Sequence, residues 1–286
     1  MFGTFASSIG KGVSLGAHTF SCAIAICGLL AIEFGVGHPN AAAPLVAVAV
    51  LTAVLLTLPE WRKCVSITGK SQQVDRSDCR RPGPQSPYVF LFTSLLIFFF
   101  AGASLQVADT GLAPAWDGWE YWMLQAENAA YFNGGEKPDY GLTQKHGNFL
   151  PAFLAILLQV LKETKAAAVL YLWPVSYALA ACSIAMAVSR LFENQSVAML
   201  VGTTFLATPI INIHASLPGY ADIIFAMLLA ALIHARILLE TEATFFRFAQ
   251  IIILSLALLT LKQIGLIVVL SMLVAEIAYG LAKKKS

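Results

Sequence analysis

Charged residues are scarce in this chain. They make up 12% of its 286 residues, about half the ~25% of an ordinary soluble domain. Hydrophobic residues reach 58%, and several apolar runs have the ~20 residues that cross a hydrocarbon layer ~30 Å thick. This composition excludes a soluble globular domain. It predicts an all-α, polytopic integral membrane protein built as a helical bundle.

Paired cysteines and common catalytic motifs are also missing. The five cysteines have no close spacing, which argues against a disulfide framework or a zinc site. There is no glycine-rich phosphate loop, no GxSxG serine and no HExxH metal motif. No basic, aromatic patch indicates nucleic acid as a partner. The candidates for chemistry are therefore polar residues near the predicted outer face of the membrane.

The apolar runs predict about eight transmembrane helices plus one short re-entrant or interfacial helix. They fall near 16–34, 41–58, 88–107, 149–161, 166–189, 197–213, 221–239, 246–261 and 264–281. The run 149–161 has only 13 residues, about 20 Å of helix, which is short for a span. If it did cross, every later loop would change sides.

The charge distribution predicts which loops lie inside. The loop 59–87 has a net charge of +3 and the segment 108–148 has −4. Because cytoplasmic loops collect Lys and Arg, the first is expected inside and the second outside, with the C-terminal lysines inside. We expect a two-helix hairpin at 1–58, a cytoplasmic linker at 59–87, and a membrane core at 88–286 that includes the external loop 108–148.

The N-terminus allows two interpretations. It carries one early lysine followed by a long apolar run, as an uncleaved signal-anchor helix would. The small residues at 41–43 also resemble the cleavage site of a signal peptide. Because the apolar run is long for a signal and another run follows at once, the anchor is the preferred interpretation.

The external loop gathers acids and aromatic residues. The stretch 114–135 has helical spacing, with Trp119, Trp122, Leu124, Ala126 and Ala129 on one apolar face, and the Asn-Gly-Gly at its end stops a helix. We expect an amphipathic helix along the membrane interface, with Asp117 at its start as a functional carboxylate. Glu120 and Glu127 are equally explained as charges that complement a helix dipole.

Two cationic residues precede the short helix that begins near Phe149. Lys145 and His146, together with Asn148, would lie at the helix N-terminus, where backbone N–H groups favour an anion. The alternative is a lysine that reaches toward the lipid headgroups and a helix that is merely capped.

A third group of candidates lies in the later spans. Asp222 opens a long apolar run directly after Pro-Gly-Tyr-Ala, either as a first-turn acid or as a functional group at the outer face. Lys262 interrupts another apolar stretch and is expected at the same face, between two helices. A turn lysine that contacts headgroups is the alternative. His214 is expected to be a structural, hydrogen-bonded histidine.

The order of these features resembles one enzyme superfamily. An acidic, aromatic loop that reads "DGWEYWMLQA" is followed by a short helix entered through a proline, then "SRLFENQ", "GYAD" and "LLTLKQIGL". This succession, over about 88–281, resembles the C-type membrane glycosyltransferases, which include protein mannosyltransferases and aminoarabinose transferases. Two features depart from the family pattern. Ile264 replaces the glutamate of the T-K-x-E-G signature, and no threonine directly precedes Lys262. The chain also ends after the core bundle, without the external domain of many relatives.

The resemblance implies a role for each candidate. Asp117 and Asp222 would be the catalytic or acceptor-orienting acids. Lys145, Lys262 and His146 would bind the phosphate of a polyprenyl-phosphate sugar, the usual donor of the family. Contacts with the sugar or acceptor would come from Trp116, Trp119, Glu120 and Tyr220.

The expected function is sugar transfer on the outer face of a bacterial inner membrane. The acceptor would be a glycan, a lipid or a protein, and membrane lipids would surround the enzyme. The sequence indicates no definite cofactor, although a divalent cation could bind if Asp117, Asp222 and His146 converge. The alternatives are a catalytically degenerate relative that binds lipid or a partner enzyme, and a multi-span transporter. A transporter would place charges at mid-membrane and would have discontinuous helices in paired halves.

Overall fold

The computed structural model describes residues 2–34, 42–70, 87–109, 122–132, 148–161, 167–216, 218, 220–241 and 243–283. These residues form an all-α bundle, as the composition predicts, and none of them lies in a β-strand. The helices are α1 (Phe2–Phe34), α2 (Ala42–Lys70), α3 (Pro87–Asp109), α4 (Leu124–Glu127) with a π-helical turn (Asn128–Phe132), α5 (Phe149–Leu161), α6 (Ala167–Leu170), α7 (Leu172–Phe192), α8 (Gln195–Ala207), α9 (Pro209–Ser216), α10 (Asp222–Thr241), α11 (Phe245–Leu261) and α12 (Ile264–Lys283).

Several of these helices have the length and composition of membrane spans. Among the described residues, α1, α2, α3, α7 and α10 are long and apolar enough to cross a membrane, and α8 with α9 makes a sixth if this bent pair is one span. The apolar parts of α11 and α12 are shorter. The sequence-based count of about eight spans therefore needs α11 and α12 to cross as well.

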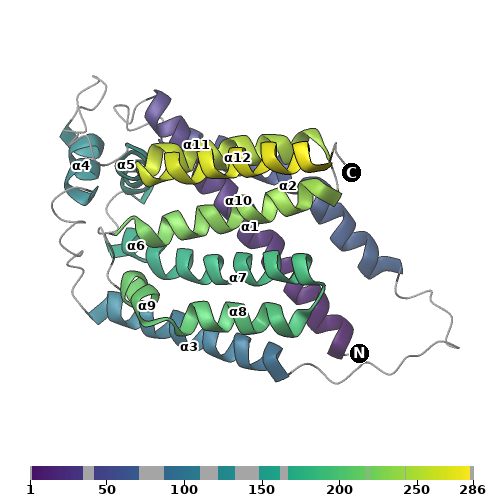
Figure 1. The fold of residues 1–286 in the computed structure, drawn as a ribbon. Coiled ribbons are helices and arrows are strands. Elements are labelled where there is room, and N and C mark those ends of the chain that lie inside the picture. Colours follow the sequence, from purple (N-terminus) through teal and green to yellow (C-terminus); the bar gives the residue numbers. More distant parts are fainter. Residues whose placement is uncertain are drawn as a thin grey trace, which may run out of the picture.

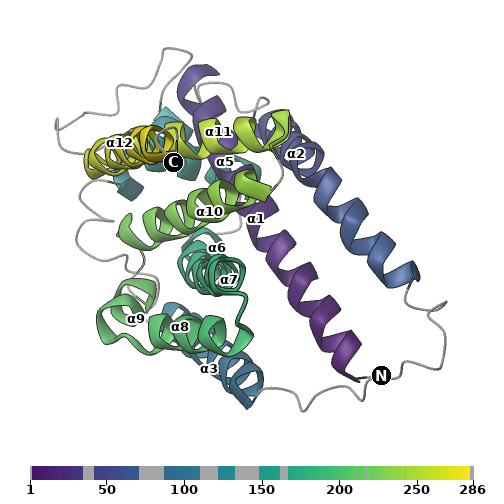
Figure 2. The same ribbon diagram turned by 45° about the vertical axis from the view of Figure 1, so that its right-hand side comes forward.

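The long helices lie side by side in one bundle (Figure 1). In Figure 1, α7, α8, α10 and α12 run nearly parallel, while α1 crosses them obliquely. The N and C labels lie toward one end, and α4, α5, α6 and α9 lie at the other. Figure 2 shows α3 beside α8, and α11 between α12 and α2. Below, the end that carries α5, α6 and α9 is called the α9 end.

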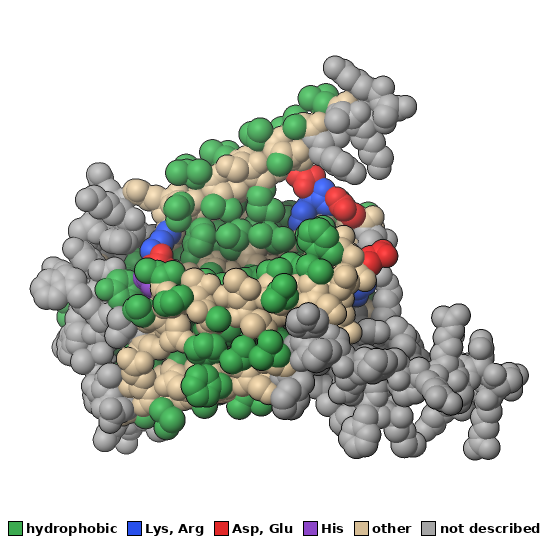
Figure 3. All heavy atoms as spheres, turned by 60° about the horizontal axis from the view of Figure 1, so that its bottom comes forward, with side chains coloured by type: hydrophobic (Ala, Val, Ile, Leu, Met, Phe, Trp, Pro, Cys, Tyr) green, Lys and Arg blue, Asp and Glu red, His purple; other side chains and the backbone are tan. Residues whose placement is uncertain are grey.

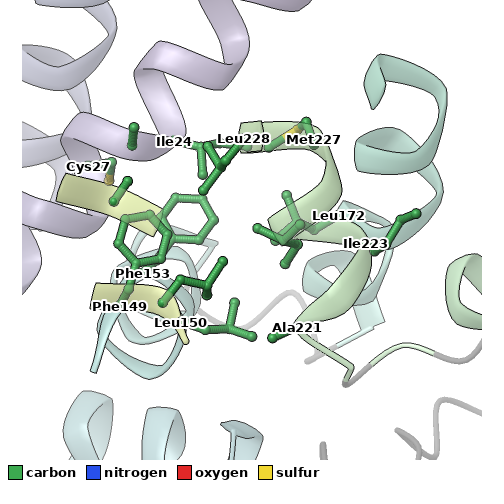
Figure 4. Close-up of a cluster of buried hydrophobic side chains, with 14 of the residues drawn as sticks. Ile24, Cys27, Phe149, Leu150, Phe153, Leu172, Ala221, Ile223, Met227 and Leu228 are labelled. Atoms are coloured by element: carbon green, nitrogen blue, oxygen red, sulfur yellow. The ribbon is translucent and has the colours of Figure 1, made fainter. Parts of the chain in front are cut away.

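The short helix α5 is the centre of the core at the α9 end. Its bounds agree with the predicted run 149–161, and nearly all of its side chains are buried. Figure 4 shows its aromatic rings packed among apolar side chains of α1, α7 and α10. Gly28 of α1 permits this approach, because an added Cβ there would lie 2.3 Å from the ring of Phe149. The elements before and after α5, α4 and α6, both lie at the same end of the bundle.

The helix predicted in the external loop is present over its described part. Trp122, Ala126 and Ala129, three members of the predicted apolar face, are buried, and α4 packs against α5. The Gln159 side chain of α5 donates a hydrogen bond to the carbonyl of Ala130 at 3.1 Å. Leu124, a fourth member, is instead 48% exposed. The described part of this loop therefore packs against α5, and it also exposes one apolar side chain, Leu124.

A buried polar network joins α1 and α2 to α11. The side chain of Gln250 accepts hydrogen bonds from His18 and Arg247, each at 3.1 Å, and donates one to the carbonyl of Leu56 at 2.9 Å. The ring of His18 also meets His234 of α10 edge to face, with centroids 5.4 Å apart. The predicted hairpin 1–58 thus shares its interior with the core helices.

Candidate functional site

Asp222 and Lys262 meet at the α9 end of the bundle. Asp222 is the first residue of α10, where a carboxylate complements the positive end of the helix dipole. Its Oδ1 accepts a hydrogen bond from Lys262 Nζ at 2.6 Å. The two residues are forty positions apart, and the sequence had placed both at the outer face. The structure brings this predicted acid and this predicted phosphate ligand into direct contact.

The tight turn between α11 and α12 fixes the position of Lys262. Lys262 is the C-cap residue of α11 and has extended backbone angles, φ −149° and ψ 150°. Its backbone N–H donates a hydrogen bond to the carbonyl of Leu258. α12 begins two residues later, at Ile264. Gly265 makes this turn possible, since a Cβ there would lie 2.0 Å from the Leu258 oxygen. A residue with a side chain at position 265 would push α12 away and move Lys262 with it.

A histidine that the sequence did not assign to the site completes the group. His214 lies in the last turn of α9, and its Nδ1 is 3.5 Å from Asp222 Oδ2. Its ring packs edge to face on Tyr220, with centroids 5.1 Å apart. The backbone of Tyr220 is held in turn, because the buried Trp173 donates its indole N–H to the Tyr220 carbonyl at 2.8 Å. We call Asp222, Lys262 and His214 the charged triad, after the ion pair that Asp222 forms with Lys262.

A bend between α8 and α9 brings His214 toward Asp222. The residue before Pro209 cannot easily remain helical, and Thr208 has an extended ψ of 115°. As a result α9 is bent by 61° from α8, so the predicted span 197–213 is two helices. The N-terminus of α8 has an ordinary N-cap, since the Asn194 side chain accepts hydrogen bonds from the backbone N–H groups of Ser196 and Val197.

An apolar hollow adjoins the charged triad. It has a volume of about 110 Å³, the space of roughly four water molecules in the liquid. It is lined by Phe205, Ile210, Ile211, His214, Asp222, Ile223 and Ala226. Apart from Asp222 and His214, these lining residues are apolar. The triad therefore places a cation and an anion beside a surface suited to a short stretch of lipid chain.

The pair of Asp222 and Lys262 is accessible and weak. The Asp222 side chain is 48% exposed and that of Lys262 is 23% exposed. Exposed ion pairs contribute about 0–1 kcal/mol to stability because solvent screens them and both side chains lose freedom. A competing anion of higher charge can therefore separate the two residues at little cost to the fold.

A second ion-pair group lies near the far end of α10. Arg236 forms a bidentate pair with Glu276 of α12 and also contacts Glu240 at 3.4 Å. Arg236 and Glu276 are again forty positions apart, so both pairs connect α10 to the chain around α12. Figure 3 shows charged side chains gathered at two places, with hydrophobic side chains between them.

Six of the predicted site residues lie outside the described residues. These are Trp116, Asp117, Trp119, Glu120, Lys145 and His146. Of the predicted set, the structure thus places Asp222, Tyr220 and Lys262, and it places them together. Within the described ranges, no three His, Cys, Asp or Glu side chains are grouped as a metal site. Asp222 and His214 would be two ligands at most, so the proposed cation would depend on Asp117 or His146.

The comparisons with known proteins identify no relative. No family model, no curated protein and no solved structure matches this chain. Over the part of the chain that the structure describes, the fold is that of a helical protein with five helices, or six with the bent pair α8–α9, that are long and apolar enough to span a membrane. Any more specific function has to be argued from the residues of the site.

Proposed function

We propose that this protein is an integral membrane glycosyltransferase that takes its sugar from a polyprenyl-phosphate donor. The acceptor hydroxyl, on a glycan, lipid or protein, would be met at the outer face of a bacterial inner membrane. The order of motifs along the chain suggests this class. The observation that carries the proposal is the contact of Asp222 with Lys262, since the donor needs a cation for its phosphate and the acceptor needs a base.

The arrangement of charge along α10 supports placement across a bilayer. Asp222 and Arg236 are fourteen residues apart, about 21 Å along a helix, and each forms its ion pair near one end of α10. The twenty residues of α10 span about 30 Å, the thickness of the hydrocarbon core. The α9 end would face outward, and α5 would make no net crossing, because its neighbours on both sides lie at this end.

Glycosyl transfer would require a cation for the leaving phosphate and a base for the acceptor hydroxyl. The acceptor oxygen forms a bond to the anomeric carbon, and the bond from that carbon to the phosphate oxygen breaks. The leaving polyprenyl phosphate keeps the electron pair, and Lys262 would stabilise its growing negative charge. The acceptor proton passes to a carboxylate within hydrogen-bond reach. Asp117 is proposed for this step, with Asp222 in the same external site.

A second candidate function is binding of the lipid phosphate without transfer. Two observations favour it. Asp222 Oδ1 is already paired with Lys262 at 2.6 Å, and Oδ2 faces the His214 ring at 3.5 Å, so an acceptor hydroxyl would have to compete with both side chains for the carboxylate. In addition, Ile264 occupies the position of the family glutamate. Such a protein would bind the donor lipid or hand it to a partner enzyme.

The experiment is a transfer assay with a radiolabelled polyprenyl-phosphate sugar and the purified protein in lipid nanodiscs. Asp222→Asn, Lys262→Gln and Asp117→Asn should each lower sugar release by at least about tenfold, in the range of single general-base and charge-stabilising groups. The matched control is Glu276→Gln, which breaks the other ion pair of the same forty-residue separation and should keep activity.

Two other results decide between the candidates. Donor binding without sugar release by the unmodified protein would favour the lipid-binding function. Release that is unchanged in Asp222→Asn and Lys262→Gln would remove the charged triad from the chemistry.

A further inference from the structure

The carboxylate of Asp222 occupies the position that an anionic ligand of Lys262 would take. The lysine ammonium is a compact charge with three donors and binds carboxylate and phosphate oxygens alike. In this structure one of these donors faces Asp222 Oδ1 at 2.6 Å, a short contact between ionised groups. The protein thus carries its own anion in the place expected for a substrate phosphate.

We propose that Asp222 closes this anion site in the free protein, and that a prenyl phosphate opens it by ion-pair exchange. The phosphate takes Lys262, while Asp222 turns to His214, its second partner in the charged triad. The inference rests on the proposed function in taking a phosphate on a lipid chain as the ligand. It goes beyond that function by making Asp222 a competitor of the substrate and His214 the residue that holds the displaced carboxylate.

His214 is placed to receive the carboxylate. Its Nδ1 lies 3.5 Å from Asp222 Oδ2, longer than a good hydrogen bond. This atom is buried and has no hydrogen-bond partner among the described residues. The ring cannot turn away freely, because Tyr220 packs against it. A small movement of Asp222 away from Lys262 would shorten this contact into a hydrogen bond and satisfy the histidine.

The apolar hollow indicates which class of phosphate ligand would take part in the exchange. It is lined by both His214 and Asp222, and its remaining walls are hydrocarbon. A phosphate on Lys262 would lie next to this hollow, which can hold the first part of an attached chain. Inorganic phosphate would gain the cation but not the hollow, so the lipid ester should bind more tightly.

The same ion pair keeps other anions from Lys262 while no donor is bound, because Asp222 already occupies the ammonium group.

The test measures the affinity of farnesyl phosphate, inorganic phosphate and farnesol for the full-length protein in nanodiscs of zwitterionic lipid. Asp222→Asn removes the competing charge and should bind farnesyl phosphate about three to ten times more tightly. Lys262→Gln should weaken binding at least fivefold. The double variant should match Lys262→Gln, because the effect of Asp222 acts through the lysine and is therefore not additive. His214→Gln should weaken the binding of farnesyl phosphate when Asp222 is unchanged. It should have no further effect when it is combined with Asp222→Asn.

The controls separate this exchange from a general loss of structure. Glu276→Gln and Arg236→Gln, in the other ion pair, should leave farnesyl phosphate affinity unchanged. Tighter binding of farnesyl phosphate than of inorganic phosphate identifies a lipid as the source of the phosphate, whereas equal binding identifies a free phosphate. Unchanged or weaker binding by Asp222→Asn would overturn the exchange, even if Lys262→Gln fails to fold. Because sugar release is not measured, failure of the proposed transfer activity leaves this result intact.

Discussion

Asp222 and Lys262 form a direct ion pair with Oδ1 and Nζ 2.6 Å apart, although forty residues separate them along the chain. One begins α10 and the other lies between α11 and α12. A second ion pair of the same separation, Arg236 with Glu276, connects the same two parts of the protein further along α10. The chain therefore contains both a candidate site and a structural control for it.

Exchanging the charges of the first pair separates a structural role from a functional one. Asp222→Lys alone should lower the apparent Tm by a few degrees, because it places two cations together at a cost of about 1 kcal/mol. Adding Lys262→Asp should restore the Tm, since an ion pair can form again in the opposite sense. Sugar release should stay lost in the double variant, because the cation is no longer at position 262. Recovery of both properties would make this pair purely structural.

Gly265 should be intolerant of a side chain. Gly265→Ala places a Cβ at 2.0 Å from the Leu258 oxygen, and overpacking of this kind costs about 1–3 kcal/mol. The matched control on the same helix is Gly280→Ala, where nothing lies within 4 Å of the added Cβ. That change should be neutral or stabilise by up to about 1 kcal/mol, because alanine favours a helix. Thermal unfolding in detergent compares the two, and equal Tm values would contradict the packing described for the turn.

Gln250 should be essential to the interior shared by α1, α2 and α11. Gln250→Leu removes the acceptor of His18 and Arg247 and the donor to Leu56. Loss of partners for buried polar groups costs about 1–3 kcal/mol each. We expect a large drop in the apparent Tm and increased proteolysis of the N-terminal hairpin. Gln195→Leu, at an exposed position of α8, serves as the control, and a similar Tm for both variants would show that the network contributes little.

Much of the helical framework could be predicted from the apolar runs alone. The run 149–161 gave the bounds of α5, and Asp222 was expected to open a span, as it does at the start of α10. Long apolar runs are reliable because only a helix satisfies their backbone within a membrane. The α8–α9 break could have been expected from Pro209, but the run 197–213 was continuous enough to hide it.

The composition of the site was harder to predict. Counting spans against the charge bias placed Asp222 and Lys262 at the same face, but it could not give their contact, which depends on the tight turn at Gly265. His214 was expected to be structural. Its approach to Asp222 follows from the bend at Pro209, a three-dimensional effect that periodicity does not encode. The resemblance rested on spaced motifs, and six of the nine site residues that it implied lie outside the described residues.

The central claim is that the charged triad and its hollow bind a prenyl phosphate, and photo-crosslinking tests it most directly. A farnesyl phosphate analogue with a diazirine on its first isoprene unit should label peptides of α9 and α10 when irradiated with the protein in nanodiscs. Labelling should fall sharply in Lys262→Gln and in Ala226→Phe, which fills the hollow, but not in Ala278→Phe on the exposed face of α12. Labelling that falls on other helices, or that none of these changes reduces, would contradict the account.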